Sequence, residues 1–417
     1  MGTKNHALGI DFGTSNSAAG FAVDGKPELI TFAPGETTLP TTFFFDFDTR
    51  QTLLGSPANL ALLDGVEGRF MRALKRVLGT TLMHEPRQIL NQRVTFVDII
   101  ARFLRHIKQQ AESQTGRTFD RALSGRPVVF HGNGDPREQQ AENDLRTCYH
   151  AAGFTEVAFM AEPEAAAIAN GALNANGQLG LIVDIGGGTS DFTLFRSHET
   201  GITTLANHGV RIGGTDFDRA ISIDRVMPLL GRGTELRNQF GTGTHTAPNA
   251  IFNDLATWEK IPFLYTAQTR RAVDDMLRQA NNPTEIARLQ STLRDELGHD
   301  IAFAVEAGKV AASTRANNPL ITLAPVEPGL TAALPAEMLP TILSDHATRL
   351  HSAMQGILTE TNTEASDIAQ VIYVGGSSLL SVVQDTAKSL FPQADHKVAE
   401  VFTAVADGLA LAAESHV

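Results

Sequence analysis

Cysteine and long apolar runs are almost absent from this chain of 417 residues. The single cysteine, Cys148, excludes an intrachain disulfide and a zinc site built from cysteines, so we expect a structural thiol in a reducing compartment. No stretch approaches the ~18 consecutive apolar residues of a membrane span, and the first residues lack the apolar segment of a secretory signal. The sequence therefore predicts a cytoplasmic protein that makes no membrane contact.

Basic residues are fewer than acidic residues in this chain. The 34 Lys and Arg residues face 46 Asp and Glu residues, which leaves a formal net charge of −12 at pH 7. Proteins that coat nucleic acid or bind anionic membranes need a net basic face, so this balance argues against both partners. The apolar fraction of 42% and the charged fraction of 19% are typical of a globular protein, and the length predicts roughly two or three domains.

Several motifs that would define a function class are also missing. The chain has neither the Gly-x-x-x-x-Gly-Lys-Ser/Thr loop of Walker-type proteins nor the Gly-x-Gly-x-x-Gly turn of dinucleotide-binding folds. It lacks the Gly-x-Ser-x-Gly elbow of hydrolases. The 13 histidines show no convincing metal-binding spacing, and we interpret His131 as a loop residue. Phosphate binding would therefore need another kind of glycine loop.

Apolar strands alternate with helices along the chain, which indicates an α/β fold. The strongest helix is expected over 94–113, where Val97, Ile100, Phe103 and Ile107 recur at helical spacing. The remaining expectations are strands at 7–12, 17–23 and within 125–130, a helix at 136–152, and mainly helical segments at 56–85, 216–313 and 331–363.

One segment occurs twice. ALGIDFGTSNSAAGFAV, from residue 7, and LGLIVDIGGGTSDFTLFRS, from residue 179, share an apolar strand that closes with Asp, then a glycine, then Thr-Ser and a return strand. Chance similarity of two hairpins is the weaker alternative, so we expect two similar lobes, each built on a β-hairpin. The predicted division is lobe I at 1–172 with an outer subdomain at about 30–95, lobe II at 173–417 with a helical outer subdomain at about 220–305, and a C-terminal helix at 402–413 near the lobe crossing.

Both hairpin turns are suited to hold a phosphate. The segments 11–16 and 184–191 place glycines where the backbone turns tightly, so that successive N–H groups form an anion nest. The aspartate that opens each turn would repel a phosphate unless a divalent cation lay between them, and a hydrated Mg²⁺ would satisfy both. Ordinary hairpin turns are the alternative, which the pairing of two such acidic turns disfavours. A third turn at 375–377 is, taken alone, as consistent with a structural role.

These motifs together resemble the actin-like ATPase superfamily, and within it the nucleotide-binding domain of the 70-kilodalton heat-shock chaperones (DnaK-type). GIDFGTSNS and LIVDIGGGTSDFTL are similar to the two phosphate motifs of that family, and AEPEAAAIANG is similar to its connecting helix. RALKRVLG, GGTDFDRAI and VIYVGGSSLL resemble three further motifs, in the order of the family. The resemblance implies two duplicated ribonuclease-H-like lobes, each a mixed sheet with flanking helices, that bind ATP or ADP with Mg²⁺.

The resemblance also implies roles for single residues. Lys75 matches the lysine that reaches the γ-phosphate and the attacking water, and Glu162 matches the glutamate that orients this water. Asp11 and Asp184 match the aspartates that hold Mg²⁺ through water. From the sequence alone, Lys75 could equally belong to a solvated basic face, and Glu162 could be an acid favoured at a helix N-terminus.

The implied nucleotide contacts come from several segments. The phosphate loops match Gly13, Thr14, Ser15 and Asn16, together with Gly186, Gly187, Gly188 and Thr189, of which Thr189 is also a catalytic candidate. The other matched positions are Gly213, Gly214, Gly375, Gly376 and Ser377. Glu306, Lys309 and Ser313 match the contacts to ribose and adenine, and their spacing places them on one helical face, where a plain surface Glu–Lys pair is the alternative.

Some positions depart from the family pattern. Leu379 and Val310 stand where the family has arginine, Phe402 stands where it has an acid, and the segment Gly132–Arg137 replaces its Pro-Ala-Tyr-Phe stretch. Losing an arginine that stacks on adenine costs on the order of 1 kcal/mol, which leaves the base preference open. The chain ends at Val417 without an acidic-leucine linker or a β-rich domain, as in the shortened, YegD-like branch, so we expect no peptide clamp.

The sequence therefore predicts a monomeric, slowly hydrolysing, chaperone-like ATPase whose lobes close on nucleotide, with hinges around 161–171 and at the C-terminal helix. Its expected partners are the nucleotide and a co-chaperone or client protein. Two alternatives remain: a small-molecule (sugar-type) kinase of the same superfold, and a non-catalytic nucleotide-sensing or filament-forming module.

Overall fold

A computed structural model describes residues 6–131, 135–169, 177–198, 201–238, 242–314, 316, 318–398 and 403–417. The chain divides into two compact units. The first unit comprises Met1–Arg211, His351–Leu379 and Ala387–Val417, and the second comprises Ile212–Leu350 and Leu380–Thr386. The predicted lobe boundary at 172 falls within the first unit, so the division into lobes stays a prediction.

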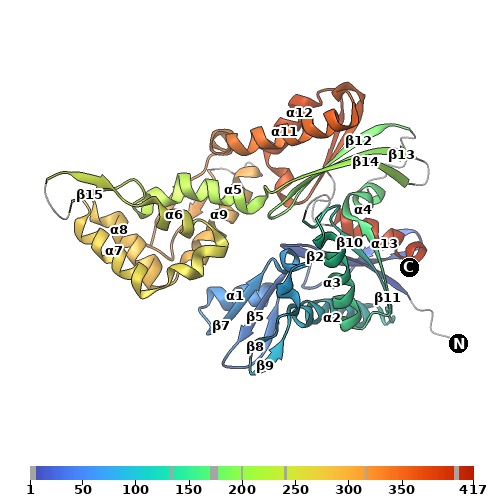
Figure 1. The fold of residues 1–417 in the computed structure, drawn as a ribbon, viewed down its shortest axis with the longest axis horizontal. Coiled ribbons are helices and arrows are strands. Elements are labelled where there is room, and N and C mark those ends of the chain that lie inside the picture. Colours follow the sequence, from blue (N-terminus) through green and yellow to red (C-terminus); the bar gives the residue numbers. More distant parts are fainter. Residues whose placement is uncertain are drawn as a thin grey trace. The chain divides into compact units, whose positions relative to one another are not determined.

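The first hairpin lies in the middle of a mixed sheet. Its strands run in the order β11-β10-β1-β2-β3, with β4 pairing β2 (Figure 1). β1 is antiparallel to β2 and parallel to β10. The bounds of these strands are Ala7–Phe12 (β1), Asn16–Val23 (β2), Lys26–Leu29 (β3), Thr38–Pro40 (β4), Arg121–Arg126 (β10) and Glu156–Ala161 (β11).

The second hairpin repeats this arrangement in a five-stranded sheet of the same unit. The order is β14-β13-β12-β19-β20, in which β12 is antiparallel to β13 and parallel to β19. Each hairpin thus has a parallel neighbour beside its first strand, so the two repeated segments have the same surroundings in their sheets. The bounds are Leu179–Ile185 (β12), Ser190–His198 (β13), Gly201–Val210 (β14), Ile368–Val374 (β19) and Asp395–Val398 (β20).

Alternating side chains of β1 face two different helix layers. Leu8, Ile10 and Phe12 are fully buried in a core with α2 (Phe96–Thr115) and α3 (Arg137–Ala152). On the other face, Ala7 belongs to a core that contains residues of both sheets together with α4 (Glu162–Ala169) and α13 (Ala404–His416), two helices that lie between the sheets in Figure 1. This layering holds the turns of both hairpins within one unit.

The strongest predicted helix, α2, is confirmed with its bounds moved by two residues. Thr95 and Asp98 form a reciprocal capping box before its first turn, and Gly116 ends it with a φ of 66°. The predicted helix at 136–152 is also confirmed as α3, and the C-terminal helix is observed as α13.

The predicted helical segment at 56–85 is wrong in its second half. Only α1 (Ser56–Leu63) is helical there, followed by β7 (Gly68–Arg72) in a three-stranded sheet with β5 (Thr42–Asp46) and β6 (Thr52–Leu54). Gly65 and Ala73 adopt positive φ angles of 67° and 59°, which a continuous helix cannot accommodate. Short 3-10 turns at Leu74–Val77 and Thr81–His84 and a hairpin of β8 (Arg87–Ile89) and β9 (Gln92–Val94) complete the segment.

Two further boundaries differ from the expectation. β10 ends at Arg126, where a strand was predicted to begin, because Pro127 has no N–H to continue the ladder. In the predicted helical segment 331–363, β18 (Thr331–Ala333) pairs with β17 (Leu320–Thr322) before α10 (Leu339–Ile342) and α11 (Ser344–Thr361). Pro340 lies in the first turn of α10, where its missing N–H is tolerated, so it does not break the helix.

The second unit is mainly helical, as predicted, with short hairpins added. β17 and β18 form one hairpin, and β15 (Glu235–Arg237) and β16 (Thr244–Thr246) form another. Its helices are α5 (Gly214–Ile221), α6 (Asn249–Leu255), α7 (Ala267–Gln279), α8 (Pro283–Arg294) and α9 (Gly298–Ser313). α12 (Ser381–Leu390) follows the turn after β19.

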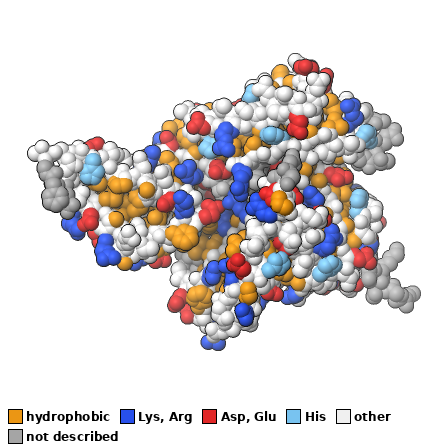
Figure 2. All heavy atoms as spheres, viewed as in Figure 1, with side chains coloured by type: hydrophobic (Ala, Val, Ile, Leu, Met, Phe, Trp, Pro, Cys, Tyr) orange, Lys and Arg blue, Asp and Glu red, His pale blue; other side chains and the backbone are white. Residues whose placement is uncertain are grey.

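The described helices and the surface visible in Figure 2 differ from what a membrane span or a strongly charged face would need. None of the helices in the described ranges combines the length and the apolar character needed to cross a membrane. Acidic and basic side chains are interspersed over the face seen in Figure 2.

Gly9 is required where α13 crosses β1. A Cβ atom at this position would lie 2.5 Å from the backbone of Leu409 and Ala410. We predict that Gly9→Ala lowers the free energy of unfolding by about 1–3 kcal/mol, as overpacked substitutions do, measured by urea denaturation. Gly356→Ala is the matched control in the same unit: its nearest neighbour would be His208 at 3.7 Å, and a helical Gly→Ala change should stabilise by about 0.5–1 kcal/mol. Equal effects of both variants would contradict this packing.

Candidate functional site

An ion pair between Lys75 and Glu162 marks the candidate site in the first unit. The Lys75 Nζ and Glu162 Oε1 atoms are 2.5 Å apart, and the two side chains are only 9% and 16% exposed. Lys75 lies in the 3-10 turn that follows the left-handed residue Ala73. Glu162 is the first residue of α4, directly after β11. The two charged groups are therefore fixed by elements that lie 87 residues apart in the chain.

Three aspartates lie in the electrostatic field of this pair. Asp11 is in β1 and Asp184 is in β12, each one residue before the strand ends. Asp191 is in β13, where its Cα is directly opposite that of Asp184 in the hairpin register. All three are partly buried. The first unit thus brings together the sequence-predicted residues Asp11, Lys75, Glu162 and Asp184.

Burial and neighbouring charges shift the pKa values of the three aspartates. Loss of hydration, together with the Glu162 carboxylate, raises the pKa of Asp11 to about 7, although Lys75 opposes this shift. The same two causes raise the pKa of Asp191 to about 7 against the hydrogen bond from Thr189 and the charge of Lys75. Burial, followed by Glu162, Asp191 and Asp11, raises the pKa of Asp184 well above its ordinary value.

The Lys75 ammonium is a positive charge that interacts with these acidic side chains. Burial by itself lowers the pKa of Lys75, but Glu162, Asp11 and Asp184 outweigh it and raise the pKa above its ordinary value. One cation thus faces four carboxyl groups, a surplus of negative charge that a divalent cation would relieve. Within the described ranges no three His, Cys, Asp or Glu side chains are grouped to chelate a metal ion directly. Metal binding by Asp11 and Asp184 through water stays a prediction.

The two glycine turns approach each other next to these aspartates. A Cβ atom on Gly187 would lie 2.5 Å from the Ser15 Oγ atom, so the second turn touches the first across this position. The first turn is anchored by a hydrogen bond from the Thr41 N–H to the Ser15 carbonyl, 2.8 Å long, and the second is closed by one of 3.0 Å from the Gly186 N–H to the Thr189 carbonyl. Thr14 is half-buried, whereas Asn16 and Thr189 are exposed.

The third turn also reaches this region. Gly375 follows β19 with a φ of 79°, and a Cβ atom there would be 2.8 Å from the Asp184 Oδ1 atom. Gly376 and Ser377 continue into a 3-10 turn that ends at Leu379. The turn at 375–377, whose role the sequence left open, thus lies directly against an acidic residue of the second hairpin.

Sequence reasoning missed two neighbours of the site. Asp191 was read only as part of the second turn, although its position opposite Asp184 follows from the length of that hairpin. Arg76 was not named as a candidate, yet its guanidinium lies where a Cβ atom of Gly188 would be. Its position next to Lys75 was the available signal.

The predicted contacts for ribose and base lie in the second unit. On α9, Lys309 is buried, with its Nζ atom 2.9 Å from an Asp218 carboxylate oxygen and 3.5 Å from the Gly214 carbonyl oxygen of α5. Glu306 is exposed and Ser313 is half-buried. Gly213 caps α5, and its N–H donates to Asp216. Lys309 is therefore not a plain surface residue, whereas its contact with ribose stays a prediction.

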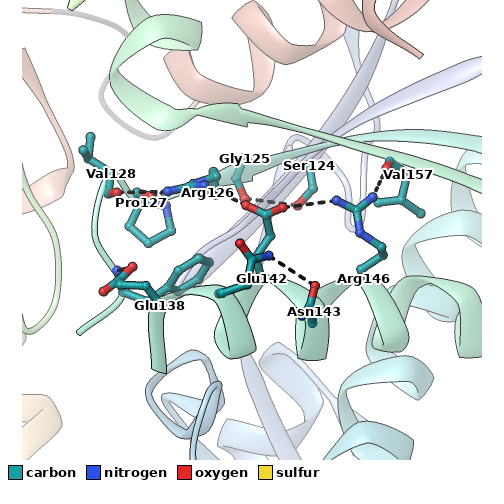
Figure 3. Close-up of polar contacts among 12 residues, drawn as sticks. Ser124, Gly125, Arg126, Pro127, Val128, Glu138, Glu142, Asn143, Arg146 and Val157 are labelled. Carbon is teal, nitrogen blue, oxygen red and sulfur yellow. Dashed lines mark hydrogen bonds and ion pairs between the residues drawn. The ribbon is translucent and has the colours of Figure 1, made fainter. Parts of the chain in front are cut away.

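A network of ion pairs fixes the end of β10 (Figure 3). Glu142 of α3 pairs with Arg126 at 2.6 Å and with Arg146 at 3.2 Å. Arg126 also donates to the carbonyls of Pro127 and Val128. The preceding residue, Gly125, packs closely against Glu162. A Cβ atom at position 125 would lie only 3.3 Å from the Glu162 Cγ atom.

The structure describes only some of the positions at which the sequence differs from the family pattern. Val310 is 52% exposed on α9, next to the buried Lys309. Leu379 is half-buried at the end of its 3-10 turn. Phe402 and residues 132–134 lie outside the described residues, whereas Asp135 and Arg137 form an ion pair of 2.6 Å.

Comparison with known proteins decides the family. A sequence model described as Hsp70 protein matches residues 7–227 and 296–417. The chain belongs to the Hsp70 family. With this membership the predicted actin-like ATPase fold is confirmed. The matched segments of this Hsp70 chain contain every predicted site residue, and the unmatched part, 228–295, lies in the helical second unit.

Curated relatives carry the same family signature. The "Chaperone protein DnaK" of Thermoplasma acidophilum is 34% identical over 220 residues, and that of Thermoplasma volcanium is 34% identical over 221 residues. The corresponding protein of Picrophilus torridus is 34% identical over 220 residues. Each match covers 51% of this chain and 34% of the relative, so the aligned part spans about a third of the length of these relatives.

The raised pKa values predict a pH-dependent stability. Asp11 and Asp191 keep a proton in the folded chain up to about pH 7, whereas the ordinary pKa of 3.8 applies when the chain unfolds. The folded state therefore binds more protons between these values, and stability falls as pH rises through this window. We predict that Asp191→Asn reduces the loss of unfolding free energy between pH 5 and pH 8 by about 1–3 kcal/mol, measured by urea denaturation with EDTA present.

An Asp48→Asn variant, which removes an exposed carboxylate of the same unit, is the control for this measurement. If Asp191→Asn and Asp48→Asn show the same pH dependence as the parent, Asp191 does not carry an elevated pKa.

Proposed function

We propose that this Hsp70-family protein binds ATP with Mg²⁺ and hydrolyses it slowly to ADP and phosphate. The single observation that carries the proposal is the Lys75–Glu162 pair, which is almost enclosed and whose charges act on Asp11, Asp184 and Asp191. An ordinary surface ion pair would not need three further carboxyl groups around it. The touching glycine turns beside the pair supply backbone N–H groups of the kind that bind phosphate.

The residues of the chain suit phosphoryl transfer to water. Mg²⁺, when bound with the nucleotide, would offset phosphate charge, and Asp11 and Asp184 are the residues that would hold it through water. The Lys75 ammonium would stabilise charge that develops on the transferred phosphoryl group. The Glu162 carboxylate would accept a hydrogen bond from the attacking water and orient it. Gly13, Gly187 and their neighbours would position the phosphates by backbone donors.

The output of this reaction is proposed to be conformational. Nucleotide binding is proposed to close the lobes and product release to open them, because a ligand shifts an equilibrium by its differential affinity for the two states. We further propose a cytoplasmic monomer that acts with a co-chaperone or client protein, in keeping with the chaperone names of its relatives.

Removing either member of the pair should abolish turnover without abolishing binding. We predict that Lys75→Met and Glu162→Gln each lower kcat for ATP hydrolysis by about 10²–10⁴-fold, the usual contribution of a positioned acid–base or charge-stabilising group. Phosphate release under excess Mg²⁺–ATP measures kcat, and isothermal titration with ATP and ADP measures binding.

Lys260→Met is the matched control, since Lys260 pairs with Asp254 at 2.7 Å on an exposed surface. This variant should behave like the parent. Absence of binding heat with ATP and ADP, with and without Mg²⁺, would refute the proposed function. Turnover that requires an added small-molecule acceptor would favour a kinase instead.

A further inference from the structure

The segment that follows Lys75 is fastened to α3 by a buried carboxylate. Asp144 is 1% exposed. Its Oδ2 atom accepts a hydrogen bond of 2.9 Å from the Gly79 N–H, and its Oδ1 atom accepts bonds from His84 Nε2, at 2.9 Å, and Gln140 Nε2, at 2.7 Å. A carboxylate is withdrawn from water only at a large cost, and here the cost is offset by three donors, two of which come from the segment 79–84.

A second attachment holds the residue before Gly79. The His131 Nε2 atom lies 2.7 Å from the Leu78 carbonyl oxygen, which can only accept, so Nε2 donates. His131 is fixed in turn, because the Glu138 carboxylate accepts hydrogen bonds from the N–H groups of Phe130, at 2.9 Å, and of His131, at 2.5 Å. Both attachments therefore come from α3 and the residues just before it.

The backbone at Gly79 packs closely against the residues that make these contacts. Its φ is 77°, and a Cβ atom would lie 2.6 Å from the Arg137 carbonyl oxygen and 2.8 Å from His131 Nε2. The backbone of the segment is thus pressed directly onto the first turn of α3. Leu78 is also fully buried, which leaves the short turn at 74–77 between this anchor and the left-handed residue Ala73.

We propose that Asp144 and His131 are positioning residues for Lys75. The Lys75 side chain must cross to Glu162 while its backbone belongs to a single 3-10 turn, which has no internal strength of its own. The anchor at Leu78 and Gly79, three and four residues after Lys75, fixes the chain directly beyond that turn, so the Lys75 Nζ atom stays 2.5 Å from Glu162 Oε1. This inference rests on the proposed role of Lys75 in ATP hydrolysis. It also states that the Lys75 side chain is held in place in the protein without nucleotide, which can be tested separately.

The test measures the chemical reactivity of Lys75 without nucleotide. Brief acetylation with an N-hydroxysuccinimide ester, followed by peptide mass spectrometry, gives the modification rate of Lys75 relative to that of Lys260, whose side chain is 58% exposed. In the parent, Lys75 should react slowly because it is 9% exposed and paired. Asp144→Leu, which removes all three acceptor bonds, should increase the relative rate at least ~10-fold, the effect of a group that loses its fixed geometry.

Three further variants separate positioning from general stability. Asp144→Asn keeps one carbonyl oxygen for the Gly79 N–H and should restore most of the parent behaviour. His131→Ala removes the other attachment and should also raise the reactivity of Lys75. This variant tests the inference independently if Asp144→Leu does not fold. Asn143→Ala changes the adjacent, exposed residue of α3, which bonds only within that helix among its described contacts, and should leave Lys75 unchanged.

Steady-state ATP hydrolysis supplies the second readout. Asp144→Leu and His131→Ala should lower kcat by about 10-fold to 10²-fold with less than threefold change in KM, because the lysine is displaced while the glycine turns remain. Parent-like reactivity of Lys75 in both variants would overturn the positioning role. A parent enzyme without turnover would refute the proposed function, yet increased reactivity of Lys75 in the same variants would still support the positioning of its side chain.

Discussion

One ammonium group among four carboxyl groups is the constraint on which the candidate site depends. The Lys75 ammonium pairs with Glu162 and lowers the pKa values of Asp11, Asp184 and Asp191, which burial and the neighbouring carboxylates raise. Like charges withdrawn from water are unfavourable, and the raised pKa values of the aspartates express this. Titratable groups with strongly shifted pKa values gather at functional sites, and the proposed binding of a cation and a polyphosphate would account for this group.

The fold brings these groups together by using one design twice. In each hairpin, an aspartate stands near the end of the first strand and a glycine turn follows it, so the repeated order of elements delivers two equivalent acids and two equivalent turns. The groups that are not repeated, Lys75 and Glu162, come from the turn after β7 and from the start of α4. The two aspartates and the two glycine turns therefore come from the repeated hairpins, whereas Lys75 and Glu162 come from unrepeated segments.

Much of this could be predicted from the sequence, and the rest could not for identifiable reasons. The two hairpins, α2 and α3 follow from local periodicity and turn chemistry, and Asp11, Asp184, Lys75 and Glu162 follow from a family resemblance. The strand at 68–72 was missed because its partner, β5, is remote in sequence and local propensity does not reveal pairing. The Asp144 anchor was invisible for the same reason: its contact with Gly79 joins residues 65 positions apart.

The helix near residue 410 has a consequence for how the chain acquires its structure. Its backbone lies against Gly9 of β1 and against Ala165 of α4, and Glu414 accepts a hydrogen bond from the Ala7 N–H. Contacts between positions some four hundred residues apart form slowly, because a long loop must close before they contribute. The packing of α13 on β1 and α4 can therefore form only after residues 404–416 have been synthesised, whereas the continuous stretch Ile212–Leu350 of the second unit is complete earlier.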